Sequence, residues 1–161
     1  MKKYLILSLM LISAITVFAQ TPNFTGKWLL NKSKTDFGQA PEFVLVRSYT
    51  VSSTEKAITI ERIALDPQMV EHPATDTLSF DGKEASSTTY SGSKRTASFK
   101  WNDDKKSFTI LSNSINKEGN PGAKVTDIWS LSPDNKTLTV ERTVVNADGS
   151  SYPIKGIYDK Q

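Results

Sequence analysis

The feature that most constrains this chain is an alternation of apolar and polar residues that recurs in short segments after residue 20. Thr, Val, Ile and aromatic residues dominate these segments, as is typical of half-buried β-strands. Pairs such as Asp81-Gly82 and Asp148-Gly149 lie between them and suit the tight turns of hairpins. The pattern predicts ten strands, at residues 25–31, 43–52, 56–64, 75–80, 84–90, 94–101, 106–114, 123–131, 137–145 and 152–159.

Short connections between these segments favour strands that pair with their neighbours in sequence. The expected fold is therefore all-β, an antiparallel up-and-down (meander) β-barrel of about eight to ten strands. A β-sandwich is the alternative arrangement. Barrel closure is favoured because it removes the exposed strand edges that a sheet protein must otherwise protect.

The first residues have the composition of an export signal. Lys2-Lys3 precedes an apolar run over residues 4–17, and Ala19 ends a small-residue cleavage site before Gln20. This predicts a cleaved signal peptide at residues 1–19, which is too short to span a membrane. The chain contains no cysteine, so no lipid anchor is expected. We expect residues 20–161 to form one lipocalin-like β-barrel domain, periplasmic or secreted.

Charge and composition exclude several function classes. Two of the 20 basic residues lie in the leader, so the mature chain has eighteen basic residues against seventeen acidic ones and lacks a nucleic-acid footprint. One histidine and no cysteine make a transition-metal site unexpected. No nucleophile-elbow or nucleotide-binding glycine motif occurs, so no catalytic residue, enzyme activity or cofactor is predicted. The single histidine, His72, is interpreted as a surface residue in a loop.

Four arginines share the apolar phase of their predicted strands: Arg47, Arg62, Arg95 and Arg142. Arginine is rarely buried unless it is paired. Matching the apolar faces of the two strands around Pro133 places Asp127 opposite Arg142, and the adjacent allowed register leaves the two residues diagonal but still within reach. An ion pair is therefore the favoured interpretation of Arg142, ahead of a role in ligand binding.

An earlier hairpin suggests a different use of arginine. A two-residue turn at Thr54-Glu55 would place Arg47 opposite Arg62, and like charges in that position destabilise a sheet. An anion should then lie between them, either a protein carboxylate or the acidic group of a ligand, unless both arginines lie in water at the barrel rim. On the ligand-binding interpretation, the candidate contacts are Arg47, Tyr49, Arg62, Phe99 and Trp101.

The motif Gly26-Lys27-Trp28 resembles the Gly-x-Trp of the first strand of lipocalins and the wider calycin group, which includes lipocalin-like domains of small exported bacterial proteins. Arg142, on a late strand, is similar in position to the arginine that packs across that tryptophan. The resemblance implies that Gly26, Trp28 and Arg142, with Asp127, close one barrel end, and that ligands enter the other. A count of ten strands is closer to fatty-acid-binding proteins, whose helical lid has no counterpart in this sequence.

Two functions remain open. A barrel with free interior space would bind a small apolar or lipid-like molecule, which could carry an anionic group, and would act as a carrier or sensor. A barrel filled by its own side chains would instead be a structural or interaction module of the cell envelope. Small residues such as Ala97 and Gly156 leave room inside, whereas three tryptophans would occupy it.

Overall fold

The structure is a computed structural model that describes residues 21–161. The predicted signal peptide lies outside the described residues. Ten β-strands and one 3-10 turn, η1 (Glu42–Val44), make up the regular structure of the described part, which confirms the all-β prediction. The strands are β1 (Gly26–Leu30), β2 (Ser48–Ser53), β3 (Ala57–Leu65), β4 (Glu71–Ser79), β5 (Ala85–Thr88), β6 (Lys94–Trp101), β7 (Ser107–Ile115), β8 (Pro121–Leu131), β9 (Thr137–Val145) and β10 (Ser151–Lys160).

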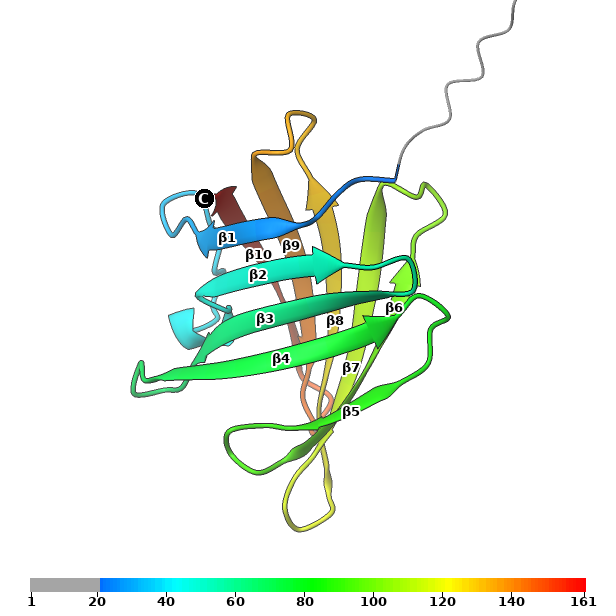
Figure 1. Cartoon of the computed structure of the whole chain (residues 1–161). Coiled ribbons are helices and arrows are strands. Elements are labelled where there is room, and N and C mark those ends of the chain that lie inside the picture. The colour runs from blue at the N-terminus through cyan, green and yellow to red at the C-terminus, as the bar shows by residue number, and fades with distance from the viewer. Residues whose placement is uncertain (1–20) are drawn as a thin grey trace, which may run out of the picture.

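The strands form one antiparallel meander that curves into a nearly closed barrel (Figure 1). The order across the sheet is β4-β3-β2-β1-β10-β9-β8-β7-β6-β5, so the first and last strands are hydrogen-bonded neighbours. Within residues 21–161, β4 and β5 end the sheet and share no ladder, although they follow each other in the chain. The predicted up-and-down barrel is confirmed, with a gap between β4 and β5.

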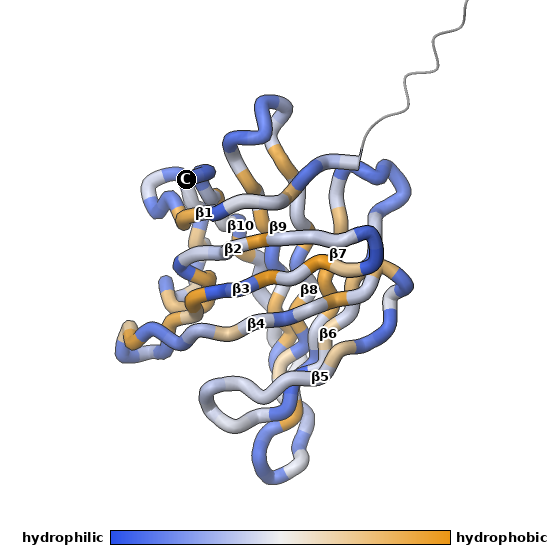
Figure 2. The backbone as a smooth tube through the Cα atoms, in the orientation of Figure 1, coloured by the Kyte–Doolittle hydropathy of each residue, from blue (hydrophilic) through white to orange (hydrophobic). Residues whose placement is uncertain are grey.

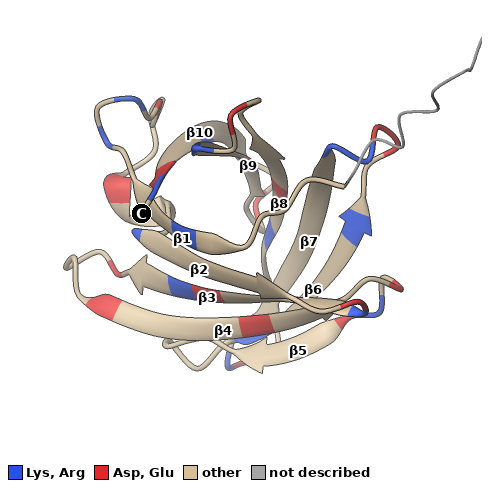
Figure 3. Ribbon diagram, turned by 45° about the horizontal axis from the view of Figure 1, so that its top comes forward, with Lys and Arg blue, Asp and Glu red and all other residues tan. Residues whose placement is uncertain are grey.

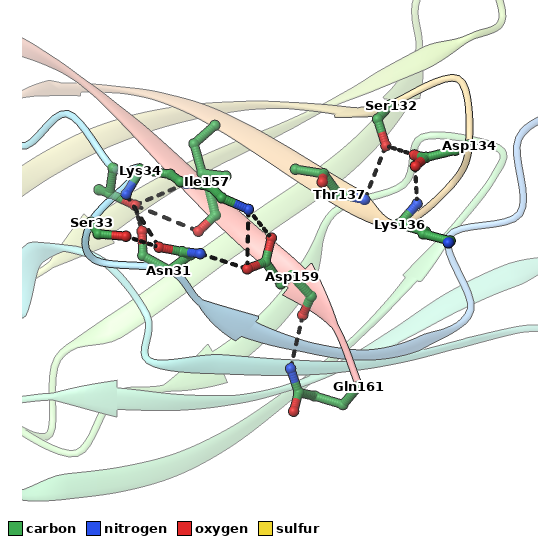
Figure 4. Close-up of polar contacts among 11 residues, drawn as sticks. Asn31, Ser33, Lys34, Ser132, Asp134, Lys136, Thr137, Ile157, Asp159 and Gln161 are labelled. Carbon is green, nitrogen blue, oxygen red and sulfur yellow. Dashed lines mark hydrogen bonds and ion pairs between the residues drawn. The ribbon is translucent and has the colours of Figure 1, made fainter.

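The closing seam between β1 and β10 is reinforced by side chains (Figure 4). The Asp159 carboxylate on β10 accepts a hydrogen bond of 2.5 Å from the side-chain amide of Asn31 and one of 3.1 Å from the ammonium of Lys34. The backbone N–H of Gln161 donates to the Lys27 carbonyl at 3.0 Å. These contacts tie the C-terminus to the first strand.

Two strands begin several residues away from their predicted starts. Strand β2 begins at Ser48 rather than residue 43, because η1 and the bend that follows it interrupt the extended chain. Strand β4 begins at Glu71, four residues before the predicted start, so His72 lies in a strand and not in a loop.

The predicted register between β2 and β3 is wrong by two residues. Val51 pairs with Ile60 and Tyr49 with Arg62, because the turn lies one residue later, at Glu55-Lys56, where the Thr54 hydroxyl oxygen accepts the backbone N–H of Ala57. A shift of two residues keeps every side chain on its face but changes its partner. Arg47 therefore does not lie opposite Arg62.

The two ends of the barrel are packed differently. The end that carries the β6–β7 and β8–β9 turns is filled with aromatic rings and is called the aromatic end below. Phe108 lies at its centre, with ring centroids 4.6 Å from Phe24, 4.8 Å from Phe99 and 5.7 Å from Trp101. Apolar residues concentrate in the strands and polar residues in the turns (Figure 2). The aromatic end thus supplies much of the core.

Candidate functional site

The interior holds a cavity of about 190 Å³ in the half of the barrel opposite the aromatic end. We call it the inner cavity. Strands β2, β3 and β4, strands β6 to β9 and the η1 segment all contribute to its wall. Its lining combines apolar side chains with five charged ones. The lining residues are Phe43, Val44, Leu45, Val46, Tyr49, Ile60, Arg62, Ala64, Asp76, Arg95, Ile110, Ser112, Val125, Asp127, Trp129 and Arg142.

One carboxylate in the inner cavity serves two arginines. Asp76 on β4 forms ion pairs with Arg62 on the neighbouring β3 and with Arg95 on β6, beyond the β4–β5 gap. One terminal nitrogen of Arg95 lies 2.9 Å from both carboxylate oxygens. Burial and the nearby Arg62 charge lower the pKa of Arg95, with Asp76 opposing them. Two positive charges therefore share one negative charge.

The second carboxylate is fully used by a third arginine. Arg142 donates hydrogen bonds of 2.7 and 2.8 Å to the two oxygens of Asp127, directly opposite it on β8, and a third of 2.5 Å to the Val44 carbonyl. Burial disfavours the charged guanidinium, but Asp127 outweighs it and raises the pKa of Arg142. The predicted Asp127–Arg142 pair is confirmed. The five charges of the cavity leave a balance of one positive charge.

Two buried polar groups beside these charges have no hydrogen-bond partner within the described residues: the Tyr49 hydroxyl and the Trp129 indole N–H. Their rings contact each other, with centroids 4.6 Å apart. The adjacent Tyr158 hydroxyl donates its proton to the Val46 carbonyl at 2.9 Å. Burial raises the pKa of Tyr49, so its phenol stays protonated at neutral pH. A buried donor without a partner is unusual and costly.

The structure separates the sequence-derived ligand contacts into three groups. Tyr49 and Arg62 line the inner cavity, whereas Phe99 and Trp101 belong to the aromatic end. The inward orientation predicted for Arg47 is wrong, because its side chain is 56% exposed and pairs with Glu71. Because the chain bends between η1 and β2, Arg47 leaves the inward phase that its spacing predicts. A role in binding stays a prediction for the others.

The tryptophan of the Gly-x-Trp strand packs against a different cation from the one that the resemblance implies. Trp28 is fully buried and its indole N–H donates to the Phe24 carbonyl at 2.9 Å. The cation over its ring is Lys160, 5.2 Å from the ring centroid, and not Arg142. The backbone N–H of Lys160 donates to the carbonyl of Lys136, in the turn just before β9, and Arg142 lies six residues farther along the chain, about 20 Å away. Arg142 therefore belongs to the inner cavity.

Asp76 and Arg95 are the main site residues that sequence reasoning did not select as ligand contacts. Asp76 alternates with Leu78, which is fully buried, so its inward phase was readable from the sequence. Its partner Arg95 is nineteen residues away and two strands on. Only the curvature that brings β6 near β4 reveals this pairing.

Residues 21–161 show few features of a metal site, a membrane-spanning helix or a patch of one charge. No group of three His, Asp or Glu side chains is placed to hold a metal ion there. No helix in this part of the chain is long and apolar enough to cross a membrane. In the view of Figure 3, basic and acidic residues are interspersed over strands and turns rather than gathered by sign.

Comparison with known proteins identifies the fold. No family model matches the sequence, and no curated protein is similar to it in sequence. Among solved structures, zebrafish ileal bile acid-binding protein complexed with cholic acid is similar, with a TM-score of 0.56 and 16% identity over 86% of this chain and 98% of that one. The N57A mutant of the fluorescent protein UnaG has a TM-score of 0.52 and 15% identity, over 86% and 96% of the chains. The chain therefore has a calycin-like barrel fold.

Proposed function

We propose that this protein binds a small amphipathic anion inside the barrel, as an exported carrier or sensor. The observation that carries the proposal is the charge balance of the inner cavity, where Arg62 and Arg95 share the single carboxylate of Asp76. An unmatched positive charge on largely buried arginines favours an anionic partner, because guanidinium groups bind carboxylates and sulfonates through charge-assisted hydrogen bonds.

The remaining residues of the cavity lining suit the apolar part of the proposed amphipathic ligand. Ile60, Ile110 and Val125 supply aliphatic surface beside the arginines. Tyr49 and Trp129, whose buried hydroxyl and indole N–H have no partner in the hydrogen-bond network of residues 21–161, also line this cavity. Few polar anchors in a mostly apolar pocket are typical of small-molecule sites. The barrel of similar fold that was solved with cholic acid, an acid with a large apolar body, fits the same description.

The alternative of a completely filled barrel holds for one half of the molecule only. Aromatic rings occupy the aromatic end, but the inner cavity remains open beside the arginine cluster.

Export is part of the proposal and rests on the leader sequence. Intact mass measurement of protein recovered from the periplasm or medium should give a chain that begins at Gln20; retention of residues 1–19 would refute export by this signal.

A matched pair of fluorescent probes tests anion binding. 8-Anilinonaphthalene-1-sulfonate and N-phenyl-1-naphthylamine share a ring system and differ by the sulfonate. We expect the sulfonate to bind the mature protein with a stoichiometry of one and more tightly than the uncharged analogue. Arg62→Gln or Arg95→Gln should weaken sulfonate binding roughly 10- to 100-fold, since a hydrogen bond to a charged group contributes about 1.5–3 kcal/mol.

The control is Arg47→Gln, which removes an arginine that is exposed and paired with Glu71 outside the cavity. It should leave the affinity for both probes unchanged. Equal affinity for the two probes, or equal losses in Arg47→Gln and Arg95→Gln, would refute an anion site at the Asp76 cluster.

A further inference from the structure

A second cavity lies in the gap between β4 and β5. It measures about 220 Å³ and is called the gap pocket below. Figure 1 shows β4 and β5 running apart from the turn that joins them, and no backbone ladder closes the space between them within residues 21–161. The lining residues are Arg62, Ala64, His72, Pro73, Ala74, Thr75, Ser87, Thr88, Thr89 and Tyr90.

The gap pocket adjoins the inner cavity. Arg62 and Ala64 line both spaces, so these side chains form part of the wall between them. The Arg62 guanidinium is turned toward Asp76 and the arginine cluster by its ion pair. The gap pocket therefore lies next to a molecule whose acidic group is at this cluster.

The outer wall of the gap pocket is a pair of stacked rings. His72 on β4 and Tyr90, in the turn after β5, have ring centroids 4.1 Å apart and planes inclined by 8°. Asp66 holds the histidine ring through a contact of 2.9 Å with Nε2. Tyr90 is 57% exposed, a large aromatic surface left in water by the described fold. Together with Pro73 and Ala74, the rings make a mainly apolar wall.

We propose that the gap pocket is the subsite for the apolar tail of the anion whose head binds at Arg62 and Arg95. This inference rests on the proposed function and names its ligand class: an amphipathic monoanion with an extended, unbranched tail. The inner cavity of about 190 Å³ is below the roughly 300–1,000 Å³ of common ligand pockets, so such a ligand needs the adjoining volume. The gap pocket offers this volume, because it shares the lining residues Arg62 and Ala64 with the inner cavity.

Carboxylates that differ only in tail length test this subsite by calorimetry. Butanoate and decanoate have the same head group. Each fully buried methylene contributes about 0.8 kcal/mol, or about a fourfold gain in affinity, so decanoate should bind the wild-type protein far more tightly. Ala74→Phe fills the gap pocket and should remove most of the gain from tail length, while the dissociation constant of butanoate stays within about threefold.

A second variant acts on the wall and does not depend on packing inside the barrel. Tyr90→Ser should weaken decanoate about fivefold and leave butanoate unchanged, because the exposed ring covers only the tail. Matched controls are Thr77→Phe, at an exposed position of the same strand as Ala74, and Leu111→Ser, which removes another exposed apolar side chain. Both controls should retain the wild-type gain from tail length.

The outcomes separate this inference from the proposed function. Loss of the tail-length gain in Ala74→Phe and Tyr90→Ser, with butanoate binding retained, supports the tail subsite. An unchanged gain in Tyr90→Ser and in folded Ala74→Phe overturns the subsite and leaves the anion site standing. If Ala74→Phe does not fold, Tyr90→Ser decides alone. Failure of both carboxylates to bind the wild-type protein overturns the proposed function and this inference together.

Discussion

Asp127 and Arg142 lie directly opposite each other on β8 and β9, and both oxygens of the carboxylate accept hydrogen bonds from the guanidinium. The pair is largely buried, with side-chain exposures of 7% and 14%. A buried charge that loses its partner is far more costly than the loss of the whole pair. The arrangement therefore makes a specific prediction for single and double variants.

Asp127→Ala should lower the free energy of unfolding by about 3–5 kcal/mol, because it leaves the Arg142 charge uncompensated. The double variant Asp127→Leu/Arg142→Met should recover most of this loss. Urea denaturation followed by tryptophan fluorescence measures both. The exposed pair of Glu141 and Lys155 provides the control, and Glu141→Ala should cost less than about 1 kcal/mol. A double variant as unstable as Asp127→Ala would contradict this account.

Two neighbouring tyrosines should respond in opposite ways to removal of the hydroxyl. Tyr158→Phe loses the bond to the Val46 carbonyl and should be destabilised by about 1 kcal/mol. Tyr49→Phe removes a hydroxyl without a partner in the described structure and should be neutral or stabilising. Thermal unfolding compares the two, and sulfonate-probe titration of Tyr49→Phe then reports whether the hydroxyl contacts the ligand. A stability loss in Tyr49→Phe equal to that in Tyr158→Phe would show that the hydroxyl is already bonded.

Gly26 should be intolerant of a side chain mainly because of its backbone conformation, and to a smaller extent because the flexible Lys160 side chain would have to move. Its φ of +143° is disfavoured for other residues, and an added Cβ would lie 2.9 Å from Cε of Lys160, the residue over the Trp28 ring. Gly26→Ala should therefore lose about 1–3 kcal/mol of stability. In a Lys160→Ala background, the same substitution keeps the backbone strain but loses the contact, so its cost should be smaller. An equal cost in both backgrounds would mean that Lys160 does not restrict position 26.

The Asp81 turn predicts a pH dependence of stability. A hydrogen bond from the Ser79 hydroxyl, with further contributions from Lys83, lowers the pKa of Asp81 to about 2. A lowered folded-state pKa contributes stability above the unfolded pKa of about 4, and this is lost as the pH falls toward 2. Asp81→Asn should thus lower the urea midpoint at pH 7 but change it little at pH 2. Asp103→Asn, in the exposed β6–β7 turn, serves as the comparison, and a pH-independent effect of Asp81→Asn would contradict the prediction.

The two predicted hairpin registers show what local sequence can determine. Matching the apolar faces of β8 and β9 favoured the register that places Asp127 opposite Arg142, and the structure has this register. A tight turn between β2 and β3 can lie at Thr54-Glu55 or one residue later, and the side chain of Thr54 stabilises the later position, which shifts the partners of Arg62. Turn capping by a single hydroxyl is too weak a signal to read from one sequence.

Contacts between distant strands were less predictable than contacts within hairpins. The Asp76–Arg95 pair depends on barrel curvature, and Lys160 reaches Trp28 because the last strand pairs with the first. Neither contact affects the alternation of apolar and polar residues within a strand, so neither can be predicted from that alternation. The fold class, by contrast, follows from a pattern repeated along the whole described chain, so errors in individual bounds did not affect it.

The gap between β4 and β5 leaves two strand edges without a backbone partner in the sheet, and this affects how molecules associate. Free strand edges are templates for pairing with a second chain, which begins aggregation. In this protein β5 has only four residues, and β4 carries Glu71 and the proline Pro73, which has no N–H to donate. A barrel that stays open along one side is thereby a poor partner for another copy of itself.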